Sequence, residues 1–166
     1  MQGLRKLLDL SERLLTAVCI LCFVVMFVLG IAAVFFRFVV ESSLAFPEEV
    51  MRYLFVWMIF LGSAVVFRRN MHAAIGIIVG YLPAVPRRVV LVSGTLVSGI
   101  FFALILWSGW QLTLRAVPQI SPALEVSMAW VYAAIPVGMG FLILYATELA
   151  VYQSRAPANE LLADDH

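Results

Sequence analysis

The chain contains 166 residues, of which 64% are hydrophobic and 13% are charged, and its formal net charge is +1. Soluble domains are nearer to half apolar and a quarter charged, so this composition, with a mean hydropathy of +1.03, predicts an integral membrane protein. A nucleic-acid-binding function is excluded, because the chain has no basic excess with which to neutralise phosphates. The length suits one compact membrane unit and is too short for the repeat-built core of a typical large secondary transporter.

Residues 1–13 combine leucines with charged side chains in a helical pattern, which predicts a short amphipathic helix at the membrane interface. The first transmembrane helix is predicted at 14–38. Its uncharged part, 14–36, is longer than the apolar region of a signal peptide and does not end in an Ala-x-Ala cleavage site. Cys19 and Cys22 form a Cys-x-x-Cys sequence inside this helix. Redox or zinc chemistry needs a thiolate, which the bilayer interior disfavours, so we interpret both as inert packing residues.

The second span, predicted at 47–67, carries charges at its first turn. Its apolar run, 53–67, would be only about 22 Å long as a helix, whereas the hydrocarbon core is roughly 30 Å thick. The helix must therefore begin near the proline at its start, which places Glu48, Glu49 and Arg52 at the membrane boundary. Charges at that depth are costly unless they are paired. The spacing predicts that each acid pairs with Arg52, at i+4 or i+3.

Two alternatives remain open for this helix. Glu49, Tyr53 and Trp57 share one helical stripe, which suits contact with another helix or with a partner protein. Alternatively, the charges satisfy one another, and the aromatic side chains only anchor the helix at the interface.

The second span ends in a charged turn with Arg68, Arg69 and His72. We expect these residues to anchor the helix at the cytoplasmic interface and to join it to 73–82, an apolar segment that is too short to span. That segment is predicted to be a helix lying in the interface or packed across the bundle. For His72, a solvated loop position and a hydrogen-bonding role remain equally open.

The third span, predicted at 89–114, would be about 39 Å long and should therefore tilt or protrude. Gly94 and Ser98 give it the small-xxx-small spacing that permits close helix contact, and Gly62 offers a similar surface on the second span.

The fourth span is predicted at 128–150 and contains Pro136. This proline should kink the helix, and a neighbouring helix or an irregular turn should then satisfy the carbonyl that it frees. The tail, 153–166, is polar and is predicted to be disordered.

Basic residues are distributed unequally between the two sides of these four spans. One side collects Arg5, Lys6, Arg13, Arg68, Arg69, Arg87, Arg88 and Arg155. The other side has Arg37, Arg52 and Arg115 beside Glu41, Glu48, Glu49 and Glu125. The positive-inside rule then places both termini in the cytoplasm. The predicted fold is an all-α integral membrane protein with four transmembrane helices and a short interfacial helix between the second and third.

Catalytic chemistry is not supported by any set of residues in the sequence. The histidines are His72, in a predicted loop, and His166, at the C-terminus, so paired axial haem ligands within the helices are absent. There is no Ser-His-Asp set or phosphate-binding loop. The central parts of the four spans also lack an acidic residue, since Glu148 lies near a span end. We therefore expect a non-enzymatic subunit of a complex, without cofactor or metal.

Two motifs resemble a known family. The run Glu49-x-x-Arg52-Tyr53-x-Phe55-x-Trp57-x-x-Phe60-Leu61-Gly62, followed by Arg68, Arg69 and His72, is similar to the small permease subunit of tripartite ATP-independent periplasmic (TRAP) transporters. The segment Trp130-Val-Tyr132-Ala-Ala-Ile135-Pro136-Val-Gly138 resembles that family's last helix. One position departs from the family pattern, because 73–77 lacks the acidic residue that often follows the histidine.

The resemblance implies a bacterial inner-membrane protein, surrounded by membrane lipids, that pairs with a large multi-helix permease and a periplasmic solute-binding protein. Such complexes drive uptake of carboxylate solutes with a sodium gradient. The large subunit holds the substrate and ion sites, and the small subunit is a scaffold. An alternative from another class is a membrane anchor or assembly subunit of a respiratory or other membrane enzyme complex.

Two sets of residues follow as candidate sites. The set expected to help dock the binding protein at the periplasmic rim is Glu41, Glu48, Glu49, Arg52, Arg115 and Glu125. The set expected to pack or anchor helices is Tyr53, Trp57, Gly62, Arg68, Arg69, His72, Gly94, Ser98 and Pro136.

Overall fold

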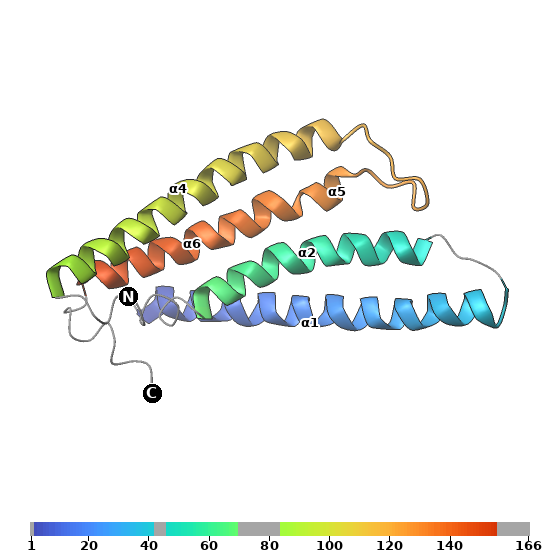
Figure 1. Ribbon diagram of the computed structural model, residues 1–166, viewed down its shortest axis with the longest axis horizontal. Helices are drawn as coiled ribbons and strands as arrows, with labels where there is room; N and C mark the ends of the chain where they lie inside the picture. The colour runs from blue at the N-terminus through green and yellow to red at the C-terminus, as the bar shows by residue number, and fades with distance from the viewer. Residues whose placement is uncertain (1, 42–45, 70–83, 156–166) are drawn as a thin grey trace.

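The computed structural model describes residues 2–41, 46–69 and 84–155, and in these ranges the protein is helical with short connections (Figure 1). The helices are α1 (Gln2–Phe38), α2 (Phe46–Arg69), α4 (Ala84–Ala116), α5 (Ala129–Tyr132) and α6 (Ala134–Arg155). Four segments are long and apolar enough to cross a membrane: Lys6–Phe38, Phe46–Arg69, Val89–Ala116 and Ala129–Gln153. The predicted fold class, an all-α protein with four such helices, is confirmed. The predicted interfacial segment 73–82 and His72 lie outside the described residues.

The first helix is longer than the sequence pattern predicted. The amphipathic residues and the first span form one uninterrupted helix of 37 residues, which is about 55 Å long. Leu8 and Leu15 of its first turns are buried, at 4% and 2% exposure. The first turns of α1 are thus part of the packed protein, because their leucines pack against residues of α2 and α6.

The four long helices lie side by side in the order α1, α2, α6, α4 (Figure 1). Helix α1 packs along α2, α2 along α6, and α6 along α4, so α1 and α4 occupy opposite edges of the row. Many large apolar side chains are consequently exposed along α1 and α4, among them Phe23, Phe27, Ile100 and Leu104. This arrangement suits a membrane, where lipid or another membrane protein covers apolar side chains.

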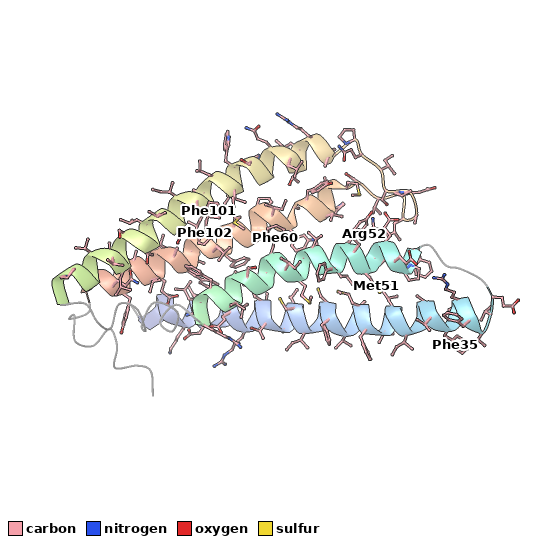
Figure 2. The ribbon with its side chains drawn as sticks, viewed as in Figure 1. Phe35, Met51, Arg52, Phe60, Phe101 and Phe102 are labelled. Carbon is pink, nitrogen blue, oxygen red and sulfur yellow. The ribbon has the colours of Figure 1, made fainter. Side chains whose placement is uncertain are left out.

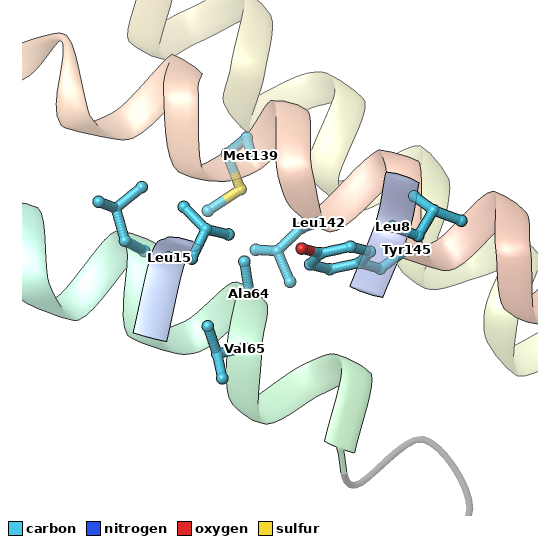
Figure 3. Packing of buried hydrophobic residues seen from close by; sticks show 8 residues of the cluster. Leu8, Leu15, Ala64, Val65, Met139, Leu142 and Tyr145 are labelled. Carbon is cyan, nitrogen blue, oxygen red and sulfur yellow. The ribbon is translucent and has the colours of Figure 1, made fainter. Parts of the chain in front are cut away.

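The hydrophobic core lies at one end of the row, the end that holds the start of α1 and the C-terminal half of α6. We call this the termini end and the opposite end the loop end. The cluster joins three helices and consists of Leu8, Leu15, Leu61, Ala64, Val65, Met139, Leu142 and Tyr145 (Figure 3). Tyr145 of this cluster is fully buried. Helices α1, α2 and α6 are therefore fastened most tightly at the termini end.

Two glycines allow helices to approach closely. A Cβ added at Gly138 of α6 would lie 2.7 Å from the Cβ of Phe60 and 2.9 Å from its carbonyl oxygen. One added at Gly109 of α4 would lie 2.5 Å from Cγ2 of Ile135. A larger residue at either position would have to push neighbouring helices apart.

The last span is interrupted at Ala133, three residues before Pro136. Ala133 keeps a right-handed helical backbone, with φ −58° and ψ −22°, so the interruption changes the hydrogen bonding more than the direction of the chain. The indole Nε1–H of Trp57 in α2 donates to the Trp130 carbonyl at 3.1 Å. A neighbouring helix thus supplies a donor beside the interruption, as buried or lipid-facing backbone requires.

The C-terminal end of the last helix differs from the prediction. Helix α6 continues to Arg155, and Gln153, which the sequence placed in the disordered tail, is helical and only 3% exposed. Its side-chain oxygen Oε1 accepts a hydrogen bond from the hydroxyl of Thr95 in α4 at 2.9 Å. This bond satisfies a polar side chain that the sequence pattern alone assigned to solvent. Residues 156–166 of the predicted tail lie outside the described residues.

Candidate functional site

Arg68, in the last turn of α2, is the centre of an ion-pair cluster at the termini end. Its guanidinium contacts three carboxylates: Nη2 lies 2.6 Å from Oδ1 of Asp9, Nη1 lies 2.7 Å from Oε2 of Glu12, and Nε lies 3.1 Å from Oε2 of Glu148. Nη1 also donates to the Leu8 carbonyl at 3.0 Å. The acids come from α1 and α6, so one side chain of α2 links three helices. Its own side chain is only 10% exposed.

Two further residues extend this cluster. Arg69 donates from Nε to Oε1 of Glu12 at 2.8 Å, although its side chain is 58% exposed. The Tyr145 ring lies beneath the Arg68 guanidinium, with 5.3 Å between Cζ and the ring centroid, which is within cation–π range. Its hydroxyl hydrogen-bonds the hydroxyl of Ser11 at 3.0 Å. Arg68 and Arg69 were expected from the sequence to anchor the helix, but none of these partners was predicted.

Glu49, at the loop end, takes part in a different arrangement. It is 7% exposed, and its Oε1 accepts a hydrogen bond from the Tyr53 hydroxyl. Its Oε2 accepts from the backbone N–H groups of Ala123 and Leu124, at 2.8 and 3.2 Å. The first turn of α2 is thereby tied to the connection between α4 and α5.

The predicted pairing of Arg52 with Glu48 or Glu49 is wrong within the described part of the chain. Arg52 and Glu48 are exposed, and neither is among the ion pairs of the described residues. For Glu49 the reason is that its carboxylate already accepts hydrogen bonds from Tyr53 and from two backbone N–H groups. Arg52 instead lies at the loop end of α2 with its side chain free to reach water or lipid head groups (Figure 2).

Residues 117–128, which we call the 117–128 hairpin, fold back on themselves. Ile120 and Ser127 form an isolated antiparallel bridge. The Ser121 N–H donates to the Val126 carbonyl at 2.9 Å, and the Met128 N–H donates to the Gln119 carbonyl at 2.8 Å. In the sequence this stretch is only the connection between the third and fourth predicted spans, and no pattern in it indicates the backbone groups that bind Glu49.

The other predicted rim residues remain at the loop end without being brought together. Glu41, Arg115 and Glu125 are exposed, as are Glu48 and Arg52. Glu41 and Glu125 have positive φ values of 55° and 54°, so each sits where the chain turns sharply. The structure thus separates Glu49, which is buried and internally bonded, from five exposed rim charges.

The predicted packing residues have varied surroundings. Gly62 faces the Cys19 sulfur, which would lie 3.9 Å from an added Cβ. At Gly94 an added Cβ would meet nothing within 4 Å, and Ser98, one turn on, is half-buried. The Gly94 surface is therefore unused within the described part of this chain. Cys19 and Cys22 are free thiols.

Comparison with known proteins shows that the chain is similar to the members of one family. A sequence model described as the DctQ component of tripartite ATP-independent periplasmic transporters matches residues 26–156. A TRAP transporter small permease protein of Haemophilus influenzae is 31% identical over 133 residues, covering 78% of each chain. A second protein so named from that organism is 32% identical over 80 residues, covering 48% of this chain and 50% of its own.

A third relative is the C4-dicarboxylate TRAP transporter small permease protein DctQ of Rhodobacter capsulatus. It is 30% identical over 126 residues, covering 75% of this chain and 55% of the relative. This chain therefore spans about half the length of two of these three relatives.

Proposed function

This chain belongs to the family of the DctQ component of tripartite ATP-independent periplasmic transporters, and we propose that it is the scaffold subunit of such a transporter. In this role it supports a large permease in the inner membrane and helps to dock a periplasmic solute-binding protein. The transported solute is a carboxylate, taken up with sodium ions. A relative named as a C4-dicarboxylate transporter subunit supports the solute class.

The observation that carries the scaffold role is the Arg68 cluster, together with the position of the charges in the spans. Arg68 locks three helices together at the termini end, which suits an element that stays fixed while a partner moves. The four spans have no acidic residue in their central parts. Ion carriers use such mid-membrane acids, so ion and substrate binding belong to the large permease.

Orientation follows from the charges at the two ends of the row. Lys6, Arg13, Arg68 and Arg69 lie toward the termini end. The loop end carries fewer basic residues, interspersed with acids. By the positive-inside rule the termini end is cytoplasmic and the loop end is periplasmic.

The contact with the large permease is proposed to include the Gly94 side of α4. Small residues let membrane helices approach closely, and Gly94 makes no such approach within this chain. The test is co-purification of both subunits in mild detergent after Gly94→Leu. Ala103→Leu is the matched control, because Ala103 is also exposed but lies half a helical turn around α4. We expect Gly94→Leu to reduce co-purification and Ala103→Leu to preserve it.

If wild-type chain elutes alone in every mild detergent, the scaffold proposal fails. If only the Gly94→Leu result is negative, the permease contacts another face.

Docking of the binding protein is proposed to use the exposed rim charges Glu41, Glu48, Arg52, Arg115 and Glu125. Charges at the rim of an interface mainly steer association, and salt screens them. Glu48→Lys combined with Glu125→Lys should therefore raise the half-saturating binding-protein concentration for transport into vesicles at low salt, and less so at high salt. Lys6→Glu, at the opposite end, is the control. An unchanged half-saturating concentration at low salt would exclude this surface.

A further inference from the structure

Two neighbouring acids in the first turn of α2 have opposite surroundings. Glu48 is exposed, whereas Glu49 is 7% exposed and has hydrogen-bond donors at both carboxylate oxygens. Two of those donors, the N–H groups of Ala123 and Leu124, are consecutive and converge on a single oxygen. Consecutive backbone N–H groups that converge in this way form a small anion-binding nest. The Glu49 carboxylate is the anion that fills it.

The 117–128 hairpin has internal hydrogen bonds that maintain its shape, but they do not set its position above α2. The bridge between Ile120 and Ser127 and the bonds across it lie wholly within the hairpin. Val117 and Ile120 are 55% and 69% exposed, so these two apolar side chains contribute little to holding the hairpin in place, whereas Leu124 and Met128 are half-buried. Glu49 reaches the tip of the hairpin from another helix, and its bonds are charge-assisted, which makes them roughly twice as strong as neutral ones.

We infer that Glu49 is a positioning residue that holds the 117–128 hairpin in place as a preformed platform for the soluble partner. This inference rests on the proposed docking of a periplasmic binding protein at the loop end. The hairpin carries one acid, Glu125, and no basic residue. A binding protein that presents a basic group opposite Glu125 is therefore the matching partner. Glu49 contributes by holding the hairpin still and does not touch the partner, because it is buried beneath the hairpin tip.

The test compares Glu49→Gln with Glu48→Gln in the assembled complex reconstituted into vesicles. Both variants remove one negative charge from the same turn, but only Glu49→Gln weakens the bonds to the hairpin. Hairpin motion is measured by the spectrum of a nitroxide attached at Ala123→Cys, an exposed position, after Cys19 and Cys22 are replaced by alanine. Docking is measured as the half-saturating concentration of binding protein for transport.

We expect Glu49→Gln to increase nitroxide mobility and to raise the half-saturating concentration about fivefold, the change expected when a charge-assisted hydrogen bond becomes a neutral one. The maximal rate per assembled complex should stay unchanged, whereas a purely structural defect would lower that rate. Glu48→Gln should leave hairpin mobility at the wild-type level. Tyr53→Phe should raise nitroxide mobility less than Glu49→Gln does, because it keeps both backbone bonds to Oε2. It removes the bond to Oε1 and the contact of the Tyr53 hydroxyl with Sδ of Met128 at 3.3 Å.

The two measurements separate a failure of the inference about Glu49 from a failure of the proposed docking. If the nitroxide is as immobile in Glu49→Gln as in the wild type, Glu49 does not position the hairpin, and the inference is wrong. If mobility rises but the half-saturating concentration is unchanged, Glu49 holds the hairpin, and the proposed docking at this surface fails. If Glu49→Gln does not assemble, Glu49→Asp replaces it. That variant keeps the charge but withdraws the carboxylate by one methylene, and it should also release the hairpin.

Discussion

Replacing Arg68 with alanine should destabilise the protein more than any other single charge removal at the termini end. The variant would leave Glu12 and Glu148, whose side chains are 20% and 22% exposed, without their common cation. Removing one partner from a buried ion pair typically costs about 3–5 kcal/mol. Asp9 adds little, because its side chain is 59% exposed and such pairs contribute at most about 1 kcal/mol. Since the two acids keep some contact with water, we expect the lower part of that range, about 3 kcal/mol.

The matched control is Arg69→Ala. Arg69 is the adjacent residue and binds Glu12, but its side chain is 58% exposed. Its removal should cost under about 1 kcal/mol, as for other exposed ion pairs. A second comparison is Arg68→Ala combined with Glu148→Gln, which neutralises the half-buried acid that loses its cation, whereas Glu12 keeps Arg69. The double variant should recover part of the stability lost in Arg68→Ala, because the two residues are in direct contact.

The free energy of unfolding is measured in mixed micelles by titration with a denaturing detergent, followed by tryptophan fluorescence. Helical content is a poor signal, because membrane helices keep their internal hydrogen bonds when they separate. If Arg68→Ala costs no more than Arg69→Ala, the cluster does not fasten the three helices. The same conclusion follows if Glu148→Gln fails to restore stability in the Arg68→Ala background.

Three further predictions concern packing and topology. Gly138→Ala should lower the free energy of unfolding by about 1–3 kcal/mol through overpacking, because its Cβ would lie 2.7 Å from a side-chain atom of α2. Gly94→Ala should be neutral or stabilising, because its Cβ would meet nothing within 4 Å. Equal effects of the two changes would contradict the close approach of α6 to α2. Thr95→Val should lower the free energy of unfolding by about 1–2 kcal/mol, the upper end for an interhelical hydrogen bond in a membrane. Thr113→Val should cost less, because the Thr113 hydroxyl donates to the Gly109 carbonyl of its own helix. The reverse order would count against the hydrogen bond between α4 and α6. In right-side-out vesicles, a membrane-impermeant thiol reagent should label a cysteine placed at Gln119, which is exposed. Labelling that occurs only after the vesicles are opened would show that the loop end is cytoplasmic, the opposite of the proposed orientation.

The spans were predictable from sequence because membrane insertion is decided locally. An uncharged stretch long enough to cross the hydrocarbon core needs no knowledge of its neighbours, and its backbone can be satisfied only as a helix. The predicted span 89–114, for example, lies within the apolar helical segment Val89–Ala116. The charges before the first predicted span suggested a separate interfacial helix, whereas that stretch is continuous with α1, and its Leu8 packs against other helices.

Side-chain partners depended on the tertiary structure. The pairing of Glu49 with Arg52 was inferred from spacing along one helix, where only local partners are visible. In the folded protein the backbone N–H groups of Ala123 and Leu124 reach the same carboxylate from 74 and 75 residues away in the sequence. A carboxylate binds whichever donors lie nearest, and their identity depends on which connection closes over the start of α2.

For the Arg68 cluster, too, the helix end was predictable from the local sequence, whereas the ion-pair partners were not. The sequence alone determined that Arg68 ends a transmembrane helix, because a charge there follows an apolar run. Its binding of Asp9, Glu12 and Glu148 depends on α2 lying between α1 and α6, an order that no local pattern encodes. Hydropathy sets where each helix enters and leaves the membrane, and the packing of one helix against another decides which charges meet at its ends.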